Sequence, residues 1–352
     1  MAATDVARLK AARGESFSPG ATEVSYSWGQ LNGIERKDKE LGVTQPIGSI
    51  LTPFYKNALT NRQIHTGNLY RLLVEKEVKA EVKRAWAYCQ FALNQRELYR
   101  EWSEMADRIE QAGACRYEQG ETTLLEKSMS ATVAAQMRNR LFQAEEDLKL
   151  AEQRLQWICY APVPLQPEES TPTLFAVPID SLSLSQTHLD YFASQKEEKR
   201  AELKLEKSRF FPELSVGYVR QNILPDKGLD SWMVGVSFPL WFVPQHSKVR
   251  QARMELRKAE IAQAEEERAL RQKVTELKAL LRRHASSIAC YTSSALAEAE
   301  QLMKSANARF QASEINISDY VQSLNTALDI RNGYLETVYQ YNIAALEYEL
   351  YH

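Results

Sequence analysis

The residues that most often carry enzymatic or metal chemistry, cysteine and histidine, are few and scattered in this sequence. The four cysteines lie 26, 44 and 131 residues apart, which matches no zinc-binding or redox spacing. The five histidines are too dispersed to form a local ligand motif, and Gly-x-Ser-x-Gly, phosphate-loop and HExxH motifs are absent. We therefore expect structural thiols, no metal site, no cofactor and no enzymatic activity; the cysteines are Cys89, Cys115, Cys159 and Cys290.

The composition excludes several other classes of protein. The 352 residues carry 44 basic and 46 acidic side chains, so no global basic field exists to bind nucleic acid. With 26% charged residues, 44% hydrophobic residues, 13 Gly and 12 Pro, the chain is neither a disulfide-rich mini-protein nor a disordered or collagen-like one. The small number of helix breakers favours long, uninterrupted elements.

An internal repeat with an offset of 193 residues organises the chain. Four pairs of segments share this offset: Phe17–Pro19 with Phe210–Pro212, Leu41–Ile47 with Val234–Leu240, Arg116–Glu121 with Arg309–Glu314, and Arg138–Asn139 with Arg331–Asn332. We interpret the chain as two copies of one unit, at 1–160 and 182–352, joined by a proline-rich linker at 161–181.

Each copy is expected to contain two strands followed by a helical hairpin. The first copy has a truncated first helix, strands at about 20–30 and 38–47, and a hairpin at about 53–158. The second has a helix at about 184–208, strands at about 212–222 and 230–240, and a hairpin at about 244–350. The first copy lacks the counterpart of most of the 184–208 helix. We expect that the chain starts inside a longer protein, or that its first helix is short.

The strand segments alternate apolar and polar residues, which is the period of a strand with one apolar face. Tyr26 and Trp28 lie on such a face in the first copy, and Trp232 and Phe238 in the second. The pattern fits a lipid-facing strand or a strand that faces a soluble core. Four strands are too few to close a membrane barrel, which needs about eight, so in a membrane the chain must pool strands with copies of itself.

The two hairpins begin with unusually long runs without proline, after Pro53 to Ala114 and after Pro244 to Ala308. At about 1.5 Å per residue each run predicts a rod of roughly 90 Å. No globular core has this length, so the helices must pair with each other or with neighbouring chains. Their many charges form a solvated face or, alternatively, line an aqueous bore.

The order and spacing of these elements resemble the TolC family of outer-membrane efflux proteins, in particular the branch that serves heavy-metal cation pumps, which includes forms joined to the pump polypeptide. The resemblance covers residues 5 to 350 and includes a duplicated Arg-[Tyr/Phe]-x-x-[Gly/Ser]-Glu turn. The segments that carry it are Ser25–Asn32, Gln45–Pro46, Gly120–Lys127 and Ser323–Ile330.

The resemblance implies a mainly α fold with a small β part, in which long helical hairpins form an α-barrel and four strands contribute to a trimeric 12-stranded β-barrel. It implies a homotrimer that spans the outer membrane, contacts its lipid and extends into the periplasm. The implied partners are a periplasmic adaptor (membrane fusion protein) and an inner-membrane RND pump. The implied function is a passive conduit that exports substrate, heavy-metal cations in the nearest branch.

The resemblance also assigns roles to residues at the two hairpin turns, which would dock the adaptor. Glycine tolerates the positive φ that such a turn requires, and Ser313 departs from the usual glycine at the second turn. The implied docking residues are Arg116, Tyr117, Gly120 and Glu121 at the first turn, and Arg309, Phe310, Ser313 and Glu314 at the second.

One turn beyond the second tip, the family often bears acidic side chains that constrict the bore. Asp319 and Gln322 occupy these positions, and Glu126 is the counterpart of Asp319 in the first copy. Three symmetry-related Asp319 carboxylates would attract cations. Alternatively, Asp319 caps or pairs on a helix surface. We expect Lys127 to neutralise the adjacent Glu126.

A different class of protein fits the same pattern, namely a soluble coiled-coil scaffold or periplasmic adaptor in which the strands form a small capping sheet. The apolar strand residues distinguish the two hypotheses. Tyr26, Trp28, Trp232 and Phe238 would contact lipid in a channel and a protein core in a scaffold.

Overall fold

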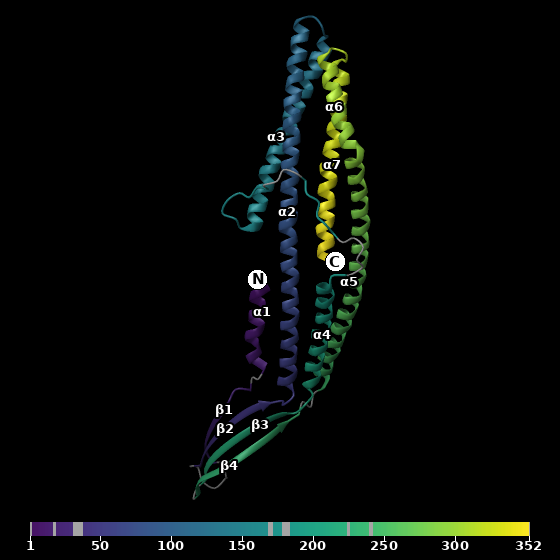
Figure 1. The fold of residues 1–352 in the computed structure, drawn as a ribbon. Coiled ribbons are helices and arrows are strands. Elements are labelled where there is room, and N and C mark those ends of the chain that lie inside the picture. The colour runs from purple at the N-terminus through teal and green to yellow at the C-terminus, as the bar shows by residue number, and fades with distance from the viewer. Residues whose placement is uncertain are drawn as a thin grey trace. The chain divides into compact units, whose positions relative to one another are not determined.

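The structure, a computed structural model, describes residues 2–16, 19–30, 38–167, 172–177, 184–223, 226–238 and 242–351 (Figure 1). The predicted segments that fall on 17–18, 31–37, 168–171, 178–183, 224–225 and 239–241 lie outside the described residues. These gaps include Phe17 of one repeat pair, Leu240 of another, and parts of the predicted linker.

The elements confirm the predicted fold class, mainly helical with one small antiparallel sheet. Those of the first copy are α1 (Ala2–Ala11), a 3-10 helix η1 (Ala12–Ser16), β1 (Glu23–Gly29), β2 (Asp38–Gly48), α2 (Thr52–Glu118) and α3 (Leu124–Cys159). Those of the second are α4 (Gln186–Ser208), β3 (Glu213–Ile223), β4 (Asp226–Ser237), α5 (Phe242–Cys290), a π-helix η2 (Tyr291–Ala295), α6 (Leu296–Gln311) and α7 (Ile317–Tyr351).

The long helical run of the second copy differs from the prediction because η2 interrupts it. No glycine or proline marks this site. Instead, two hydroxyl side chains bond back to the backbone there: Thr292 Oγ1 donates to the carbonyl of Ile288 at 3.0 Å, and Ser293 Oγ donates to that of Cys290 at 3.2 Å. The same kind of bond occurs within uninterrupted helices of this chain, for example from Thr275 to the carbonyl of Arg271, so these bonds do not by themselves account for η2. β4 also begins four residues earlier than predicted, at Asp226.

The chain packs as two compact units, each built from both copies of the repeat. Unit 1 consists of Met1–Val74 and Gln186–Ala269, and unit 2 of Glu75–Ser185 and Leu270–His352. This division by packing is distinct from the division at 1–160 and 182–352, which stays a prediction from the sequence.

Unit 1 contains the four-stranded sheet, in the order β1-β2-β3-β4 with every neighbouring pair antiparallel. The register places Val24, Val43, Tyr218 and Trp232 in one row across the sheet. Residues directly opposite each other share a face, so one face is largely apolar. The other face carries mostly small or polar residues: Ser25, Ser27, Gly42, Thr44, Ser215, Gly217, Ser231, Gly235 and Ser237.

The helical part of unit 1 is held by a small core in which Leu203 of α4 packs with Val249 and Ala252 of α5. A buried pair of hydroxyls, Thr66 Oγ1 and Ser194 Oγ, lies 2.8 Å apart and joins α2 to α4.

Unit 2 has the larger core, formed where α2, α3, α6 and α7 pack together. Trp102 of α2 and Met137 of α3 are almost fully buried there, as are Leu324 and Leu328 of α7. The buried residues of α2 in this core, Leu98, Trp102, Ala106 and Ile109, recur every three to four residues, which is the spacing of an amphipathic stripe. This core positions the two hairpin turns, which both belong to unit 2.

Two features of the whole chain bear on its chemistry. Within the described ranges, none of the helices combines the length and the apolar character needed to cross a membrane. All four cysteines are free; Cys89 is buried and the other three are exposed.

Candidate functional site

The first hairpin turn, between α2 and α3, closes through a pair of backbone hydrogen bonds around a glycine. The amide of Glu121 donates to the carbonyl of Arg116 at 2.9 Å, and the amide of Gly120 donates to that of Tyr117 at 3.0 Å. Gly120 has φ +72°, the left-handed conformation expected at this position of a Schellman motif. The side chain of an L-residue would strain this backbone, which explains glycine in the sequence.

The second turn, between α6 and α7, repeats this geometry 193 residues later. The amide of Glu314 donates to the carbonyl of Arg309 at 2.9 Å, and that of Ser313 donates to Phe310 at 3.1 Å. Ser313 has φ +59° although it is not glycine. The departure from glycine therefore changes the side chain at the turn and not its backbone.

Each turn is followed by a helix whose first residues are capped in the same way. The hydroxyl of Thr123 accepts a hydrogen bond from the amide of Glu126 at 3.3 Å. At the repeated position, Asn316 Oδ1 accepts from the amide of Asp319 at 2.8 Å. Thr and Asn are both favoured N-cap residues, because a side-chain oxygen there satisfies a backbone amide that has no partner within the helix.

Arg116 connects the two turns. Its Nη2 donates to the carbonyl of Phe310 at 3.0 Å and to Ser313 Oγ at 2.9 Å, and its guanidinium lies 4.8 Å from the centre of the Phe310 ring. The repeated arginine behaves differently, since Arg309 pairs with Glu314 of its own turn at 3.4 Å.

The aromatic residue before each turn contacts the same position of the following helix, with different chemistry. In the first copy, Lys127 Nζ lies 4.7 Å from the centre of the Tyr117 ring. In the second, Phe310 stacks on Tyr320 with ring centres 4.7 Å apart. Lys127 thus faces the Tyr117 ring, and the neutralisation of Glu126 by Lys127 stays a prediction.

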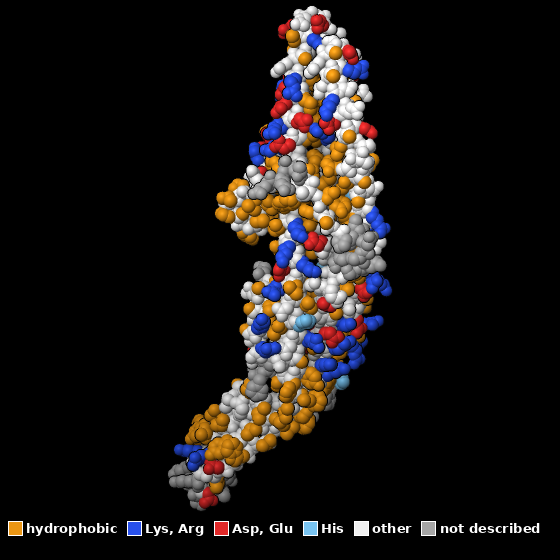
Figure 2. Space-filling view, viewed as in Figure 1, with side chains coloured by type: hydrophobic (Ala, Val, Ile, Leu, Met, Phe, Trp, Pro, Cys, Tyr) orange, Lys and Arg blue, Asp and Glu red, His pale blue; other side chains and the backbone are white. Residues whose placement is uncertain are grey.

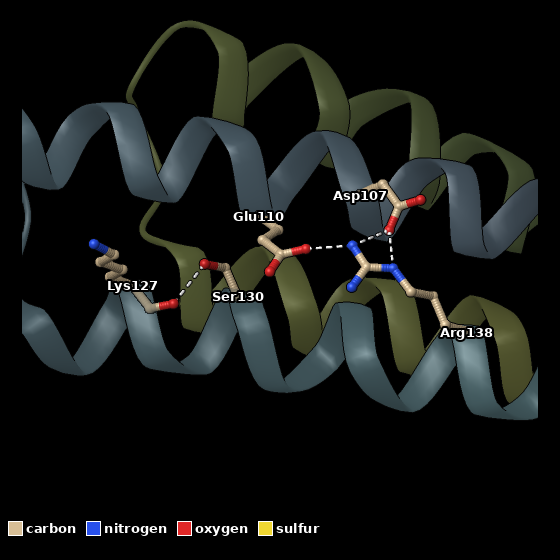
Figure 3. Close-up of polar contacts among 5 residues, drawn as sticks. All are labelled: Asp107, Glu110, Lys127, Ser130 and Arg138. Carbon is tan, nitrogen blue, oxygen red and sulfur yellow. Dashed lines mark hydrogen bonds and ion pairs between the residues drawn. The ribbon is translucent and has the colours of Figure 1, made fainter.

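Close to the first turn, Arg138 of α3 forms ion pairs with two carboxylates of α2 (Figure 3). Arg138 donates from Nε to Asp107 at 2.9 Å and from Nη2 to Glu110 at 2.5 Å. The helices approach so closely nearby that a Cβ on Gly113 would lie 2.5 Å from Ser130 Oγ. Ser130 in turn donates to the carbonyl of Lys127 at 2.8 Å.

The predicted constriction residues lie on the helices that leave the turns. Asp319 and Gln322 are exposed, and their spacing of three residues places them on one face of α7. Glu126 is half-buried and accepts a hydrogen bond from the hydroxyl of Thr122. Asp319 also lies in the first turn of α7, where a carboxylate is favoured by the positive end of the helix dipole.

The predicted lipid-facing side chains are exposed on unit 1. Tyr26, Trp28, Trp232 and Phe238 have 52%, 74%, 77% and 63% of their surface accessible. Figure 2 shows hydrophobic side chains gathered over the strands of unit 1. Large contiguous apolar patches are rare on soluble monomers and are typical of surfaces that contact lipid or protein.

The sequence did not indicate three of these contacts: the bond from Arg116 to the opposite turn, the stacking of Phe310 on Tyr320, and the contact of Lys127 with Tyr117. No group of three or more His, Cys, Asp or Glu side chains within the described segments is arranged to hold a metal ion.

Comparison with known proteins identifies the fold. No protein-family model and no curated protein sequence matches the chain. Solved structures do match, over 99% of the chain. CusC, described in terms of transmembrane channel formation, has 14% identity and a TM-score of 0.83 over 87% of its chain. The outer membrane protein VceC of Vibrio cholerae has 14% identity to the chain and a TM-score of 0.82, with 91% of VceC covered. The outer-membrane channel OprN has 12% identity and a TM-score of 0.83, with 85% of OprN covered.

The chain therefore has the TolC-type fold, which it shares with outer-membrane channels. The three scores differ by no more than 0.01, so the likeness does not single out the heavy-metal branch that the sequence resembles.

Proposed function

We propose that this protein is the outer-membrane channel of a tripartite efflux system, a passive homotrimeric conduit rather than an enzyme. The observation that carries the proposal is the exposed apolar face of the sheet, found on a chain with the TolC-type fold.

The sheet supports a trimer that spans the membrane. In the single chain, β1 and β4 are edge strands, each paired on one side. Open edges of this length attract further strands, and a lipid environment requires that every backbone group be paired. Three copies of the four-stranded sheet, joined β4 to β1, would close into one continuous sheet. Its apolar face would contact lipid, and its small, polar face would line the passage.

The two hairpin turns are the proposed docking site of a periplasmic adaptor, which would link the channel to an inner-membrane RND pump. Apolar side chains are exposed immediately after the first turn, with Leu124 at 61% and Leu125 at 69% accessible. The second turn has Ile317, buried, in place of Leu124. The first turn therefore offers the larger apolar contact, and the second offers a more polar one.

For the transported substrate, we propose a preference for cations. The exposed Asp319 of three copies would place three carboxylates around one passage, which favours cations over anions. Heavy-metal cations as substrate rest on the sequence resemblance alone.

The proposal is tested by purifying the full chain in detergent and measuring its mass and conductance. We expect three chains of 40.3 kDa per particle and ion conductance in a planar bilayer. A monodisperse monomer in buffer without detergent would contradict the proposal and favour the soluble coiled-coil scaffold, in which Tyr26, Trp28, Trp232 and Phe238 are covered by protein.

A further inference from the structure

The helices of unit 1 carry a cluster of basic side chains near the sheet, although the chain as a whole has nearly equal numbers of basic and acidic residues. At the start of α5, between residues 242 and 258, five residues are Lys or Arg and one is acidic. Exposed cations also lie in the second half of α4. The cluster, which we call the basic face, consists of Arg200, Lys204 and Lys207 of α4 with Arg250, Arg253 and Arg257 of α5.

The six residues of the basic face lie on the same side of the α4–α5 pair. Within each helix they recur at spacings of three and four residues, so they share one side of that helix. The two helices pack on each other through Leu203 and Val249. A small groove between them is lined by Glu198 and Glu255, whose positions lie on the opposite side of each helix from the six cations. The basic face is therefore separated from the groove, where both signs of charge occur.

Most cations of the basic face are not neutralised by the protein. Arg200 pairs with Glu197 at 2.5 Å, and Arg257 pairs with Glu260 at 3.3 Å. These two arginines are the members of the basic face that lie farthest from the sheet on their helices. The members that form no ion pair within the described segments are Lys204, Lys207, Arg250 and Arg253. Unpaired like charges on one surface repel each other, so an anion bound among them is stabilised.

The basic face adjoins the apolar face of the sheet. Lys207 lies one residue before the end of α4, and Arg250 lies eight residues after the start of α5, about 12 Å along its axis. Figure 2 shows Lys and Arg side chains over α4 and α5 on the same side of unit 1 as the hydrophobic side chains over the strands. Because the other face of the sheet is mostly small or polar, this hydrophobic surface is the apolar face. An apolar surface bordered by unpaired cations matches a membrane with anionic headgroups.

We propose that the basic face binds the phosphates of an anionic phospholipid, phosphatidylglycerol, on the periplasmic side of the outer membrane. The headgroup layer is roughly 5–8 Å thick on each side of the hydrocarbon core. With the sheet in that core, Lys204 and Lys207 lie at the depth of the headgroups, and the long side chain of Arg250 extends toward them. The adjoining apolar surface favours a membrane over an acidic protein, which the charges alone would bind. This inference rests on the proposed function, to which it adds a lipid preference.

The test measures lipid binding by native mass spectrometry of the full chain in detergent. The probes are phosphatidylglycerol and phosphatidylethanolamine with the same short acyl chains, inorganic phosphate, and a poly-glutamate peptide. The test variant is Lys207→Gln with Arg250→Gln. Its matched control is Arg200→Gln with Arg257→Gln, which removes two cations from the same face, farther from the sheet. Circular dichroism verifies that both variants are folded.

We expect the wild type to bind phosphatidylglycerol in preference to phosphatidylethanolamine, and this preference to shrink at high salt, which screens exposed charges. The test variant should bind phosphatidylglycerol about 10-fold more weakly than the wild type, and the control should bind it as the wild type does. Equal binding by the test variant and its control would overturn the inference. Displacement of the lipid by an equal concentration of inorganic phosphate would overturn it in favour of a free-anion site. Tighter binding of poly-glutamate than of the lipid would overturn it in favour of an acidic protein partner.

The outcome is separable from that of the proposed function. A conducting trimer that binds both phospholipids equally contradicts the role of the basic face alone. A non-conducting monomer that still prefers phosphatidylglycerol, and loses this preference in the test variant, contradicts the channel alone.

Discussion

Arg116, near the end of α2, donates a hydrogen bond of 2.9 Å to the hydroxyl of Ser313 in the opposite hairpin turn. Ser313 occupies the position that glycine occupies in the first turn, and it adopts the same left-handed backbone at φ +59°. The unfavourable conformation of a non-glycine residue is thus accompanied by a contact that glycine cannot make. The serine hydroxyl therefore adds a second acceptor, beside the carbonyl of Phe310, to the link between the two turns.

Removing this link should loosen the second turn more than the first. Arg116→Ala eliminates the bonds to Phe310 and Ser313 and the contact with the Phe310 ring. For partly exposed groups we expect a loss of about 1 kcal/mol of local stability. Hydrogen exchange of the amides of Ser313 and Glu314 should then accelerate about fivefold. Arg309→Ala, which removes only an exposed pair within one turn, serves as the control, and equal effects of the two variants would refute the link.

The backbone of the first turn should be sensitive to any side chain at Gly120. Gly120→Ala forces alanine to φ +72° and should destabilise unit 2 by about 1 kcal/mol. Gly14→Ala is the control, because Gly14 has an ordinary φ and nothing within 4 Å of an added Cβ. Denaturant unfolding in detergent measures both variants. If Gly120→Ala were as stable as the control, the turn would tolerate an L-residue as it does at Ser313, and strain would not explain the glycine.

The two turns show which features of the structure the sequence predicts and which it does not. The repeat offset and the Arg-[Tyr/Phe]-x-x-[Gly/Ser]-Glu pattern can be recognised in the sequence, so the sequence predicts both turns and the elements around them. The bond from Arg116 to Ser313 joins residues 197 apart, and no local pattern encodes it. The π-helix at Tyr291–Ala295 was missed because Thr292 and Ser293 read as ordinary helix surface residues.

Asp319 provides a test of the proposed cation preference. Because Asn316 caps the helix through the backbone amide of Asp319, its carboxylate is not needed for that bond. Asp319→Asn should therefore fold normally while it lowers cation selectivity and relieves block by multivalent cations. Single-channel recording of the reconstituted trimer measures both. Glu314→Gln, an exposed carboxylate in the turn itself, is the control. Unchanged selectivity and block would assign Asp319 to the helix surface.

The two faces of the sheet should respond oppositely to a charge. Trp232→Arg places a guanidinium on the apolar face, where in lipid it should cost about 2–4 kcal/mol near the membrane centre. Ser231→Arg places the same group on the opposite face of the same strand. We expect Trp232→Arg to reduce insertion into vesicles severely, and Ser231→Arg to insert normally with altered conductance. Equal insertion of both variants would contradict a lipid-facing role for the apolar face.

Burial should make Cys89 the least reactive of the four cysteines. Burial, followed by the negative charge of Glu152, raises the pKa of the Cys89 thiol to about 11. The thiolate is the reactive form, so Cys89 should resist alkylation at pH 8. The other three cysteines are exposed and should be labelled. Mass spectrometry of peptides after iodoacetamide treatment measures this, and the same reaction in guanidinium, where all four should be labelled, is the control.

The raised pKa of Cys89 also predicts how stability depends on pH. Because folding favours the neutral thiol, its contribution is fully present below the pKa of an unfolded cysteine, about 8.5, and is lost as the pH rises toward 11. The free energy of unfolding of the wild type should fall between pH 8 and 10.5 by about 1–2 kcal/mol more than that of Cys89→Ala. The packing cost of Cys89→Ala is the same at both pH values and cancels in this difference. If the two proteins lost stability in parallel, the thiol would titrate without a penalty from burial, and the packing around Cys89 in α2 would be open to water.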